Sequence, residues 1–264
     1  MQPEEAKMER KELPVAVFDS GVGGISVLRE LVRLMPGEDF YFFGDSIHAP
    51  YGTRPQEEIR SLTLENISHM YQRGIKGIVV ACNTATSAAI AALRERYTDI
   101  PVVGIEPALK PAVMEKEDAT VLVMATPMTV QANKFRTLMA RFADRATVLP
   151  LGCPGLMEYV EAGKMEGEEV EQYLRELLAP YIGRIDAVVL GCTHYPFLRK
   201  SIRRVLGSGP HILDGSEGTA REVQRRLTQM GLLRDRVQGG TVMFEESMPE
   251  KIRLCRFLLE YREQ

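Results

Sequence analysis

Two segments of this sequence combine a thiol with side chains that can hold an anion. They are Cys82-Asn83-Thr84 and Cys192-Thr193-His194, and each follows a run rich in Val and Ile. Such a run predicts a buried strand, so each thiol should lie at the carboxyl end of a strand, where open α/β sheets bind their ligands. The helix expected after each strand favours the thiolate, which is the reactive form of cysteine. Both segments are therefore candidates for proton transfer by a thiol.

His194 lies two residues after Cys192, so a turn can place its imidazole beside that thiol. An imidazole in that position can share or relay the thiol proton. A dyad like that of a cysteine protease is one interpretation, but it gives Cys82 no role. A metal site made by Cys82, Cys192 and His194 is another, although no two cysteines have the C-x-x-C spacing of a structural zinc site.

A pair of thiols has a specific use, which is to exchange a proton on carbon from opposite faces. Inversion needs one base on each face, one starting as thiolate and the other as thiol, and each turnover exchanges their states. The hydrogen next to a carboxylate is very weakly acidic, so the site must exclude water and stabilise the developing enolate with hydrogen-bond donors. The candidate donors are Ser20, Asn83, Thr84 and Thr193.

Two further motifs are suited to holding carboxylates. The segment Asp19-Ser20-Gly21-Val22-Gly23-Gly24 follows a predicted strand and opens a helix, so its backbone N–H groups can approach an anion. Dinucleotide binding is an alternative, but Ser26 replaces the third glycine of that fingerprint. On the carboxylate interpretation, Asp19 is available as a partner in proton transfer. The turn at Tyr51-Gly52 can offer two more N–H groups to a second carboxylate.

The elements that position these motifs occur twice. Strand-like and helix-like segments alternate along the chain, which indicates parallel sheets covered by helices. Segments of the second half then match segments of the first in the same order and at a nearly constant offset. The matched pairs are 14–20 with 120–126, 75–84 with 185–194, and 101–106 with 210–215.

This repeat predicts an α/β fold of two pseudo-symmetric α/β domains with mainly parallel sheets and the active site in the cleft between them. We expect residues 13–104 and 213–264 to form the first domain and residues 105–212 to form the second. The first domain then contributes Asp19, Ser20 and Cys82, and the second contributes Cys192 and His194.

The composition is that of an ordinary globular protein. Its 33 Lys and Arg residues nearly balance its 36 Asp and Glu residues, which argues against a protein that coats nucleic acid. No apolar run is long enough to span a membrane, and residues 1–14 read as a solvated tail without the apolar core of a signal peptide. We therefore predict a cytoplasmic protein with no nucleic-acid or membrane partner. Of its four reduced cysteines, Cys153 and Cys255 are expected to be structural.

Four motifs agree in order and spacing with a known family: DSGVGG at 19–24, PYGTRP at 50–55, CNTA at 82–85 and GCTHYP at 191–196. Together they resemble the bacterial glutamate racemases, and the resemblance extends from about residue 14 to the C-terminal helix. It implies interconversion of L- and D-glutamate with no cofactor, neither pyridoxal phosphate, metal nor nucleotide. It also implies a supply of D-glutamate for peptidoglycan synthesis, and hence for the cell wall and cell shape, and a homodimer.

The resemblance further implies roles for individual residues. Cys82 is implied to remove the α-proton of D-glutamate and Cys192 that of L-glutamate, with Asp19 and His194 assisting the respective thiols. The implied substrate-binding pairs are Asp19-Ser20, Tyr51-Gly52, Asn83-Thr84 and Thr193-His194.

Two other functions stay open on the sequence. A racemase of aspartate or another amino acid would use the same two-thiol scheme, and only the length of the substrate side chain separates it from a glutamate racemase. A nucleotide- or carboxylate-binding module without catalysis would use the glycine loop alone. That second function leaves the paired cysteines unexplained.

Overall fold

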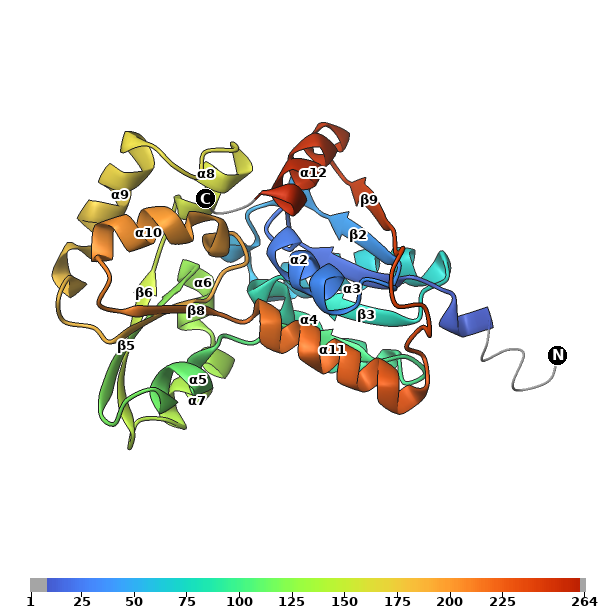
Figure 1. The fold of residues 1–264 in the computed structure, drawn as a ribbon, viewed down its shortest axis with the longest axis horizontal. Helices are drawn as coiled ribbons and strands as arrows, with labels where there is room; N and C mark the ends of the chain where they lie inside the picture. The colour runs from blue at the N-terminus through green and yellow to red at the C-terminus, as the bar shows by residue number, and fades with distance from the viewer. Residues whose placement is uncertain (1–8, 262–264) are drawn as a thin grey trace.

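The computed structural model describes residues 9–261, which form two parallel sheets covered by helices (Figure 1). The first sheet has the strand order β4-β3-β1-β2-β9 and the second has the order β6-β5-β7-β8. The first contains β1 (Val15–Asp19), β2 (Phe40–Gly44), β3 (Gly77–Val80), β4 (Val102–Gly104) and β9 (Val242–Glu246). The second contains β5 (Ala119–Ala125), β6 (Ala146–Gly152), β7 (Ala187–Leu190) and β8 (His211–Asp214). The predicted α/β class is confirmed.

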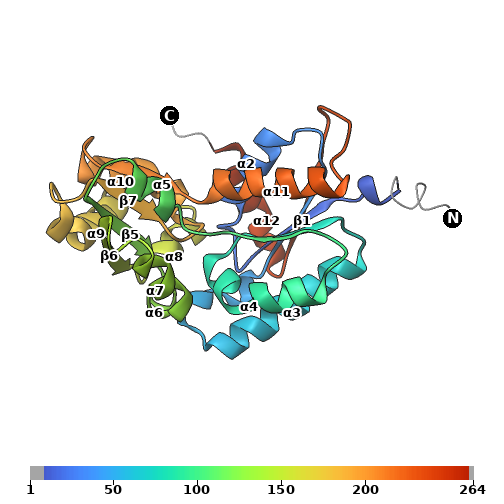
Figure 2. The same cartoon turned by 90° about the horizontal axis from the view of Figure 1, so that it is seen from below.

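Each sheet and the helices on it make one lobe. The first lobe carries α2 (Ile25–Leu34), α3 (Gln56–Gln72), α4 (Asn83–Arg96), α11 (Ser216–Met230) and α12 (Ile252–Glu260). The second carries α5 (Leu109–Met114), α6 (Pro127–Gln131), α7 (Asn133–Ala140), α8 (Leu156–Glu161), α9 (Glu168–Leu178) and α10 (Arg199–Leu206). Figure 2 shows the lobes side by side from below, with the chain crossing between β4 and α5 and between β8 and α11.

The internal repeat is visible in the topology. Replacing β1, β2, β3 and β4 by β5, β6, β7 and β8 converts the order β4-β3-β1-β2 into β8-β7-β5-β6, which is the second sheet. The strand β9 has no counterpart and adds a fifth strand beside β2. The segment after residue 215 therefore returns to the first lobe. The expected boundary between residues 212 and 213 falls inside β8, and the division into domains remains our proposal.

Alternating side chains of the central strands build the core of the first lobe. Val15 and Val17 of β1 pack into the same cluster as α2, whereas Ala16 and Phe18 pack into the cluster on the α3 and α4 side. This follows from the two-residue period of a strand that is buried on both faces. The cluster on the α2 side continues into the second lobe, where it includes Leu156 of α8. The two lobes therefore share apolar packing beside the cleft.

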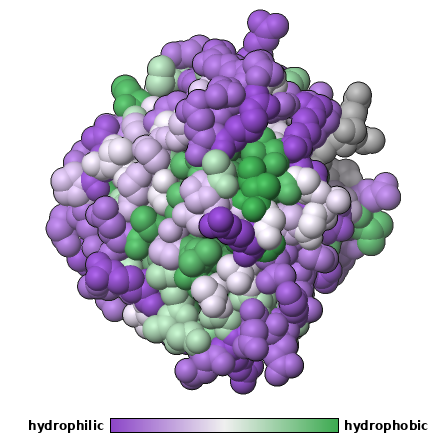
Figure 3. All heavy atoms as spheres, turned by 90° about the vertical axis from the view of Figure 1, so that its left-hand side faces the viewer, coloured by the Kyte–Doolittle hydropathy of each residue, from purple (hydrophilic) through white to green (hydrophobic). Residues whose placement is uncertain are grey.

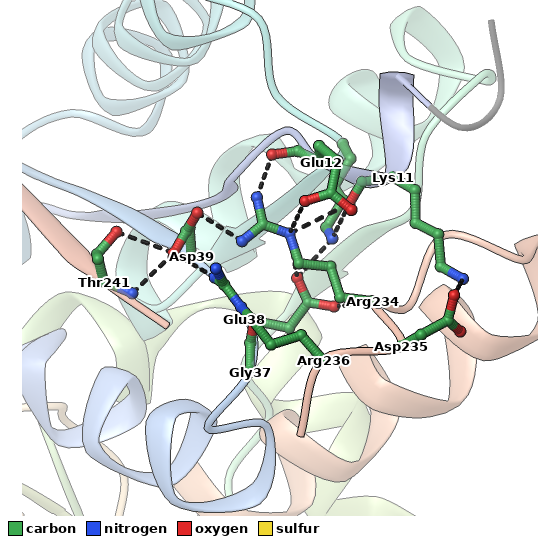
Figure 4. A network of polar contacts seen from close by, with 10 residues as sticks. Lys11, Glu12, Gly37, Glu38, Asp39, Arg234, Asp235, Arg236 and Thr241 are labelled. Atoms are coloured by element: carbon green, nitrogen blue, oxygen red, sulfur yellow. Dashed lines mark hydrogen bonds and ion pairs between the residues drawn. The ribbon is translucent and has the colours of Figure 1, made fainter. Parts of the chain in front are cut away.

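A buried ionic network fastens the chain at the amino ends of the first sheet (Figure 4). Lys76 Nζ lies 2.5 Å from Glu38 Oε2, and both side chains are almost fully buried. The N–H of Arg234 donates to Glu38 Oε1 at 2.7 Å, and Lys76 Nζ donates to the carbonyl of Lys11 at 2.6 Å. The prediction of a solvated tail is therefore wrong around Lys11, because backbone carbonyls of the tail satisfy buried cations. Residues 1–8 lie outside the described part of the chain.

We expect Lys76→Met to lower the free energy of unfolding by about 3 kcal/mol, because it removes the cation nearest to a buried carboxylate and leaves only the more distant Arg234. Urea denaturation of the variant and the parent protein measures the difference. Lys116→Met is the matched control, because Lys116 pairs with Asp186 at the surface and such pairs contribute less than about 1 kcal/mol. Equal effects of the two substitutions would contradict the prediction.

A second buried acid lies at the carboxyl end of β9. Burial raises the pKa of Glu246 to about 8, and the charges of Glu161 and Asp19 add to the effect. The Cys255 thiol donates to its Oε1 at 3.4 Å. Because the folded state prefers the protonated carboxyl, this group stabilises the fold fully below its ordinary pKa of about 4.5. That stabilisation is lost as the pH rises through 8.

We therefore expect Glu246→Gln to gain stability relative to the parent protein as the pH rises from 5 to 9. The gain should be at least about 1.4 kcal/mol, which corresponds to one pKa unit. Urea denaturation at pH 5, 7 and 9 measures it, and a difference that does not change with pH would contradict it.

The outer surface of the second lobe is mostly hydrophilic (Figure 3). There α9 and α10 form ion pairs such as Arg204 with Glu171, at 2.8 Å. Among the described residues, no helix combines the length and the apolar character that crossing a membrane requires.

Candidate active site

A small cavity lies between the lobes, at the carboxyl ends of the central strands. It is lined by Ser20, Tyr51, Gly52, Cys82, Asn83, Thr84, Thr126, Met157, Gly191, Cys192, Thr193 and His194. Nine of the ten site residues predicted from the sequence are among them, and the tenth, Asp19, lies behind the lining. The cavity volume is about 10 Å³, which is hardly enough for one water molecule. The lobes must therefore separate to admit any larger ligand.

Cys82 faces the cavity from the first lobe. It follows β3 and caps the N-terminus of α4, where its Sγ accepts from the N–H of Ala85 at 3.4 Å. The hydroxyl of Ser20 donates to the same sulfur at 3.3 Å. Burial raises the pKa of Cys82 to about 12, and the charge of Asp19 contributes to the rise. The structure therefore favours a protonated thiol at this position.

Cys192 faces the cavity from the second lobe, at the equivalent place after β7. Its Sγ lies 3.7 Å from Nδ1 of His194. On the other side of the ring, Nε2 lies 2.8 Å from Oε1 of Glu161. Burial opposes a charged imidazole, but the contacts with Cys192 and Glu161 outweigh it and raise the pKa of His194 well above 6.5. This side of the cavity therefore carries an imidazolium between a sulfur and a carboxylate.

Asp19 connects the two lobes behind the cavity. Its Oδ2 accepts from the hydroxyl of Thr193 at 3.0 Å, and its Oδ1 accepts from the N–H of Gly21 at 3.0 Å. Burial raises the pKa of Asp19 to about 6, although the charge of His194 and both hydrogen bonds oppose the rise. Asp19 can therefore change its protonation near neutral pH, and its charge acts on the thiol of Cys82.

The glycine loop binds an anion, but the anion is a side chain of the second lobe. The N–H of Val22 donates to Oε1 of Glu161 at 3.0 Å. A Cβ atom at Gly21 would lie 2.3 Å from that same oxygen, and a Cβ at Gly23 would lie 2.3 Å from Nδ1 of His194. Glycine is therefore required here because the loop approaches the acid and the imidazole of the second lobe closely.

The turn after β2 is held by a buried carboxylate. The Tyr51 hydroxyl donates to Oδ2 of Asp45 at 2.7 Å, and the amide of Asn66 donates to the same oxygen at 3.0 Å. A Cβ atom at Gly52 would lie 2.7 Å from the Cβ of Thr126 in the second lobe. The phenol of Tyr51 is thus anchored by Asp45, and the backbone of the turn lies close to the opposite lobe at Gly52.

Three hydroxyl groups meet across the cleft beside Asn83. Thr84 Oγ1 lies 3.3 Å from that of Thr126 and 3.2 Å from that of Thr129. The side-chain oxygen and nitrogen of Asn83 are buried and have no hydrogen-bond partner among the described residues. An unpaired buried amide is costly, so this side chain is suited to bind a polar ligand in the cavity.

Sequence reasoning missed Glu161, Thr126 and Thr129. The repeat contained a signal for Thr126, because the match of 14–20 with 120–126 aligns it with Ser20. Nothing in the sequence distinguishes Glu161 from the other glutamates of the chain, a residue type that is mostly solvated.

The described residues contain no group of three or more His, Cys, Asp or Glu side chains that could hold a metal ion. Cys82, Cys192 and His194, the alternative metal site suggested by the sequence, instead make the contacts described above. All four cysteines are buried free thiols.

Residues 17–223 match the Asp/Glu/hydantoin racemase family. The chain belongs to this family. It is 47% identical over 255 residues to the glutamate racemase of Clostridium perfringens (strain ATCC 13124), an alignment that covers 96% of this chain and 98% of the relative. The fold of this chain is also similar to the folds of solved racemase structures.

Two glutamate racemases among these structures show the similarity. The structure of an isoform from Bacillus anthracis has a TM-score of 0.85 and 33% identity, with 96% of each chain covered. The structure from Francisella tularensis, solved in complex with D-glutamate, has a TM-score of 0.81 and 26% identity, again with 96% of each chain covered. This member of the Asp/Glu racemase family is therefore an enzyme of the racemase class, which excludes a binding module without catalysis.

Proposed function

We propose that this racemase interconverts L- and D-glutamate by proton transfer between two cysteines, without a cofactor. The observation that carries the proposal is the equivalence of Cys82 and Cys192. They follow equivalent strands of two repeated lobes and line the same cavity. A carbon held between them has one sulfur on each face, which is the arrangement that inversion by two bases requires.

The reaction is a balanced exchange of one proton. A thiolate takes the α-proton, so a C–H bond breaks and an S–H bond forms, and the electron pair stays on the substrate as an enolate. The opposite thiol then gives its proton to the other face of the carbon, so its S–H bond breaks and a new C–H bond forms. We propose that Asn83, Thr84 and Thr193, which line the cavity, donate to the carboxylate that carries the developing charge.

The charges of the resting site favour one starting state. Cys82 has no cation beside it and is buried with Asp19, which keeps it a thiol. Cys192 instead has a cation beside it, the His194 imidazolium, whose Nδ1 lies 3.7 Å from the sulfur. We therefore infer that Cys192 is the thiol that removes the first α-proton, which is that of L-glutamate according to the family resemblance.

Glutamate is favoured over aspartate by the relatives rather than by the shape of the cavity. The chain resembles glutamate racemases over nearly its whole length, and a similar solved structure is a complex with D-glutamate. We further propose that the enzyme is a cytoplasmic homodimer that supplies D-glutamate for peptidoglycan.

Proton NMR in D2O tests the proposed reaction. Purified protein is mixed with D-glutamate without any added cofactor, the loss of the α-proton signal is followed, and the chirality of the product is analysed in the same tube. We expect exchange together with the appearance of L-glutamate, and we expect it to persist after exhaustive chelation.

Each other outcome points to a specific revision. Exchange with aspartate but not with glutamate would replace the substrate and keep the two-thiol scheme. Loss of activity on chelation would contradict the proposed absence of a metal. A heat-inactivated sample controls for uncatalysed exchange.

A further inference from the structure

The C-terminal segment of the first lobe contacts the proton-handling groups of the second. The short helix Pro249–Lys251 follows β9 and leads into α12. Lys251 Nζ lies 3.1 Å from Oε2 of Glu161 and donates to its backbone carbonyl at 2.6 Å. Glu161 is the last residue of α8, in the second lobe. Figure 1 shows α12 on the side of the first lobe that faces α8.

This contact is the outer end of a chain of charged groups that leads to a thiol. Lys251 holds one oxygen of Glu161, and the other oxygen contacts Nε2 of His194 at 2.8 Å. Nδ1 of the same ring lies 3.7 Å from the sulfur of Cys192. The exposed fraction of the side chain falls from 23% at Lys251 to 13% at Glu161 and 2% at His194, so the chain runs from the surface into the closed site.

Lys251 completes the set of groups that keep Glu161 charged and in place. Burial alone would raise the pKa of this acid, yet its pKa is lowered to about 2 by His194, the N–H of Val22 and Lys251. His194 and Val22 both contact Oε1, so Lys251 is the group that holds Oε2. A carboxylate held at one oxygen only can rotate and lose the geometry that orients the imidazole.

We propose that Lys251 is a positioning residue of the active site, which holds Glu161 across the lobe boundary so that Glu161 fixes His194 beside Cys192. The contact joins the two lobes, because Lys251 belongs to the first and Glu161 to the second. The inference rests on the proposed function, because the position of His194 matters only if Cys192 exchanges protons.

The test compares Lys251→Met, which removes the charge and keeps the apolar stem, with the parent enzyme. We expect kcat/KM to fall about tenfold, the effect of losing one hydrogen bond to a charged group. The fall must be equal in the two directions, because the equilibrium between the enantiomers is fixed.

Alkylation provides a readout that a merely structural role would not change. Iodoacetamide reacts with the thiolate, and peptide mass spectrometry reports each cysteine separately. We expect alkylation of Cys192 in Lys251→Met to slow severalfold at pH 7, because the His194 imidazolium is no longer held 3.7 Å from its sulfur. Alkylation of Cys82 should keep its parent rate.

Matched variants separate positioning from general damage. Lys251→Arg keeps a cation of similar reach and should restore most of the activity and the alkylation rate. Lys164→Met breaks an exposed pair with Glu169 at 2.8 Å in the second lobe, three residues from Glu161, and should change neither. In a Glu161→Gln background, Lys251→Met should cause no further loss, because its partner is already altered. Lys251→Gln replaces the methionine variant if that one does not fold.

Parent-like activity in Lys251→Met would overturn the proposal. So would a loss of activity that leaves alkylation of Cys192 unchanged and that arginine does not rescue. Normal racemisation by Cys192→Ala would instead overturn the proposed function. The alkylation profile of the lysine variant does not depend on that result, so the two failures are distinguishable.

Discussion

Replacement of either Cys82 or Cys192 by alanine is expected to lower racemisation by at least about 10³-fold. Each thiol is proposed to serve one face of the substrate carbon, so neither can replace the other. Removing one member of a catalytic unit costs nearly as much as removing the whole unit. Coupled assays in both directions measure the loss, and circular dichroism with thermal unfolding verifies that the fold is intact.

Cys153→Ala is the matched control, because Cys153 is also buried near the site and does not line the cavity. It should keep activity within severalfold of the parent enzyme. In D2O, any residual exchange should be specific for one enantiomer: L-glutamate for Cys82→Ala and D-glutamate for Cys192→Ala. Racemisation at the parent rate by either alanine variant would end the two-base scheme.

Much of the fold was predictable because the sequence contains it twice. Buried strands of a parallel sheet are nearly continuous apolar runs, so segments such as 14–20 and 120–126 are recognisable and can be aligned. Their polar termini then identify the edge where the lobes meet. The same alignment pairs Ser20 with Thr126, so this residue was within reach of sequence reasoning.

Contacts between distant segments were not predictable in this way. Lys11 lies in a charged stretch that resembles a solvated tail, yet its backbone carbonyl accepts hydrogen bonds from Lys76 and Arg234. Glu161 depends in the same way on a histidine 33 residues away and on the N–H of Val22. A charge is stable in the interior only when partners from other segments surround it, and periodicity carries no record of those partners.

The glycine loop illustrates a partial success. Its position after β1 and its capacity to bind an anion with backbone N–H groups were predicted from the sequence. The sequence alone pointed to a ligand, whereas the bound anion is Glu161 of the other lobe. The close approach at Gly21 and Gly23 therefore serves the alignment of the lobes at the site of proton transfer.

Gly23→Ala is accordingly expected to lower kcat/KM by about 10²-fold with little effect on the fold. The new methyl group would lie 2.3 Å from Nδ1 of His194 and 2.6 Å from Oγ1 of Thr193. Both atoms belong to the opposite lobe, and both lie at the site of proton transfer. The clash must displace the imidazole from Cys192 or hold the lobes apart, and a displacement of about 1 Å costs roughly 10²-fold in rate.

A second glycine separates this steric effect from the general cost of adding a methyl group. Gly218 lies within α11 and has no atom within 4 Å of the added Cβ, so Gly218→Ala should keep full activity. It should also gain about 0.5–1 kcal/mol of stability, because alanine is more favourable than glycine inside a helix.

Steady-state kinetics in both directions and thermal unfolding compare the two variants. Because the positive-φ positions of the chain do not include Gly23, a loss confined to Gly23→Ala reports contact between the lobes rather than backbone strain. Equal activity of the two variants would mean that the loop can retreat, and that His194 is positioned by Glu161 alone.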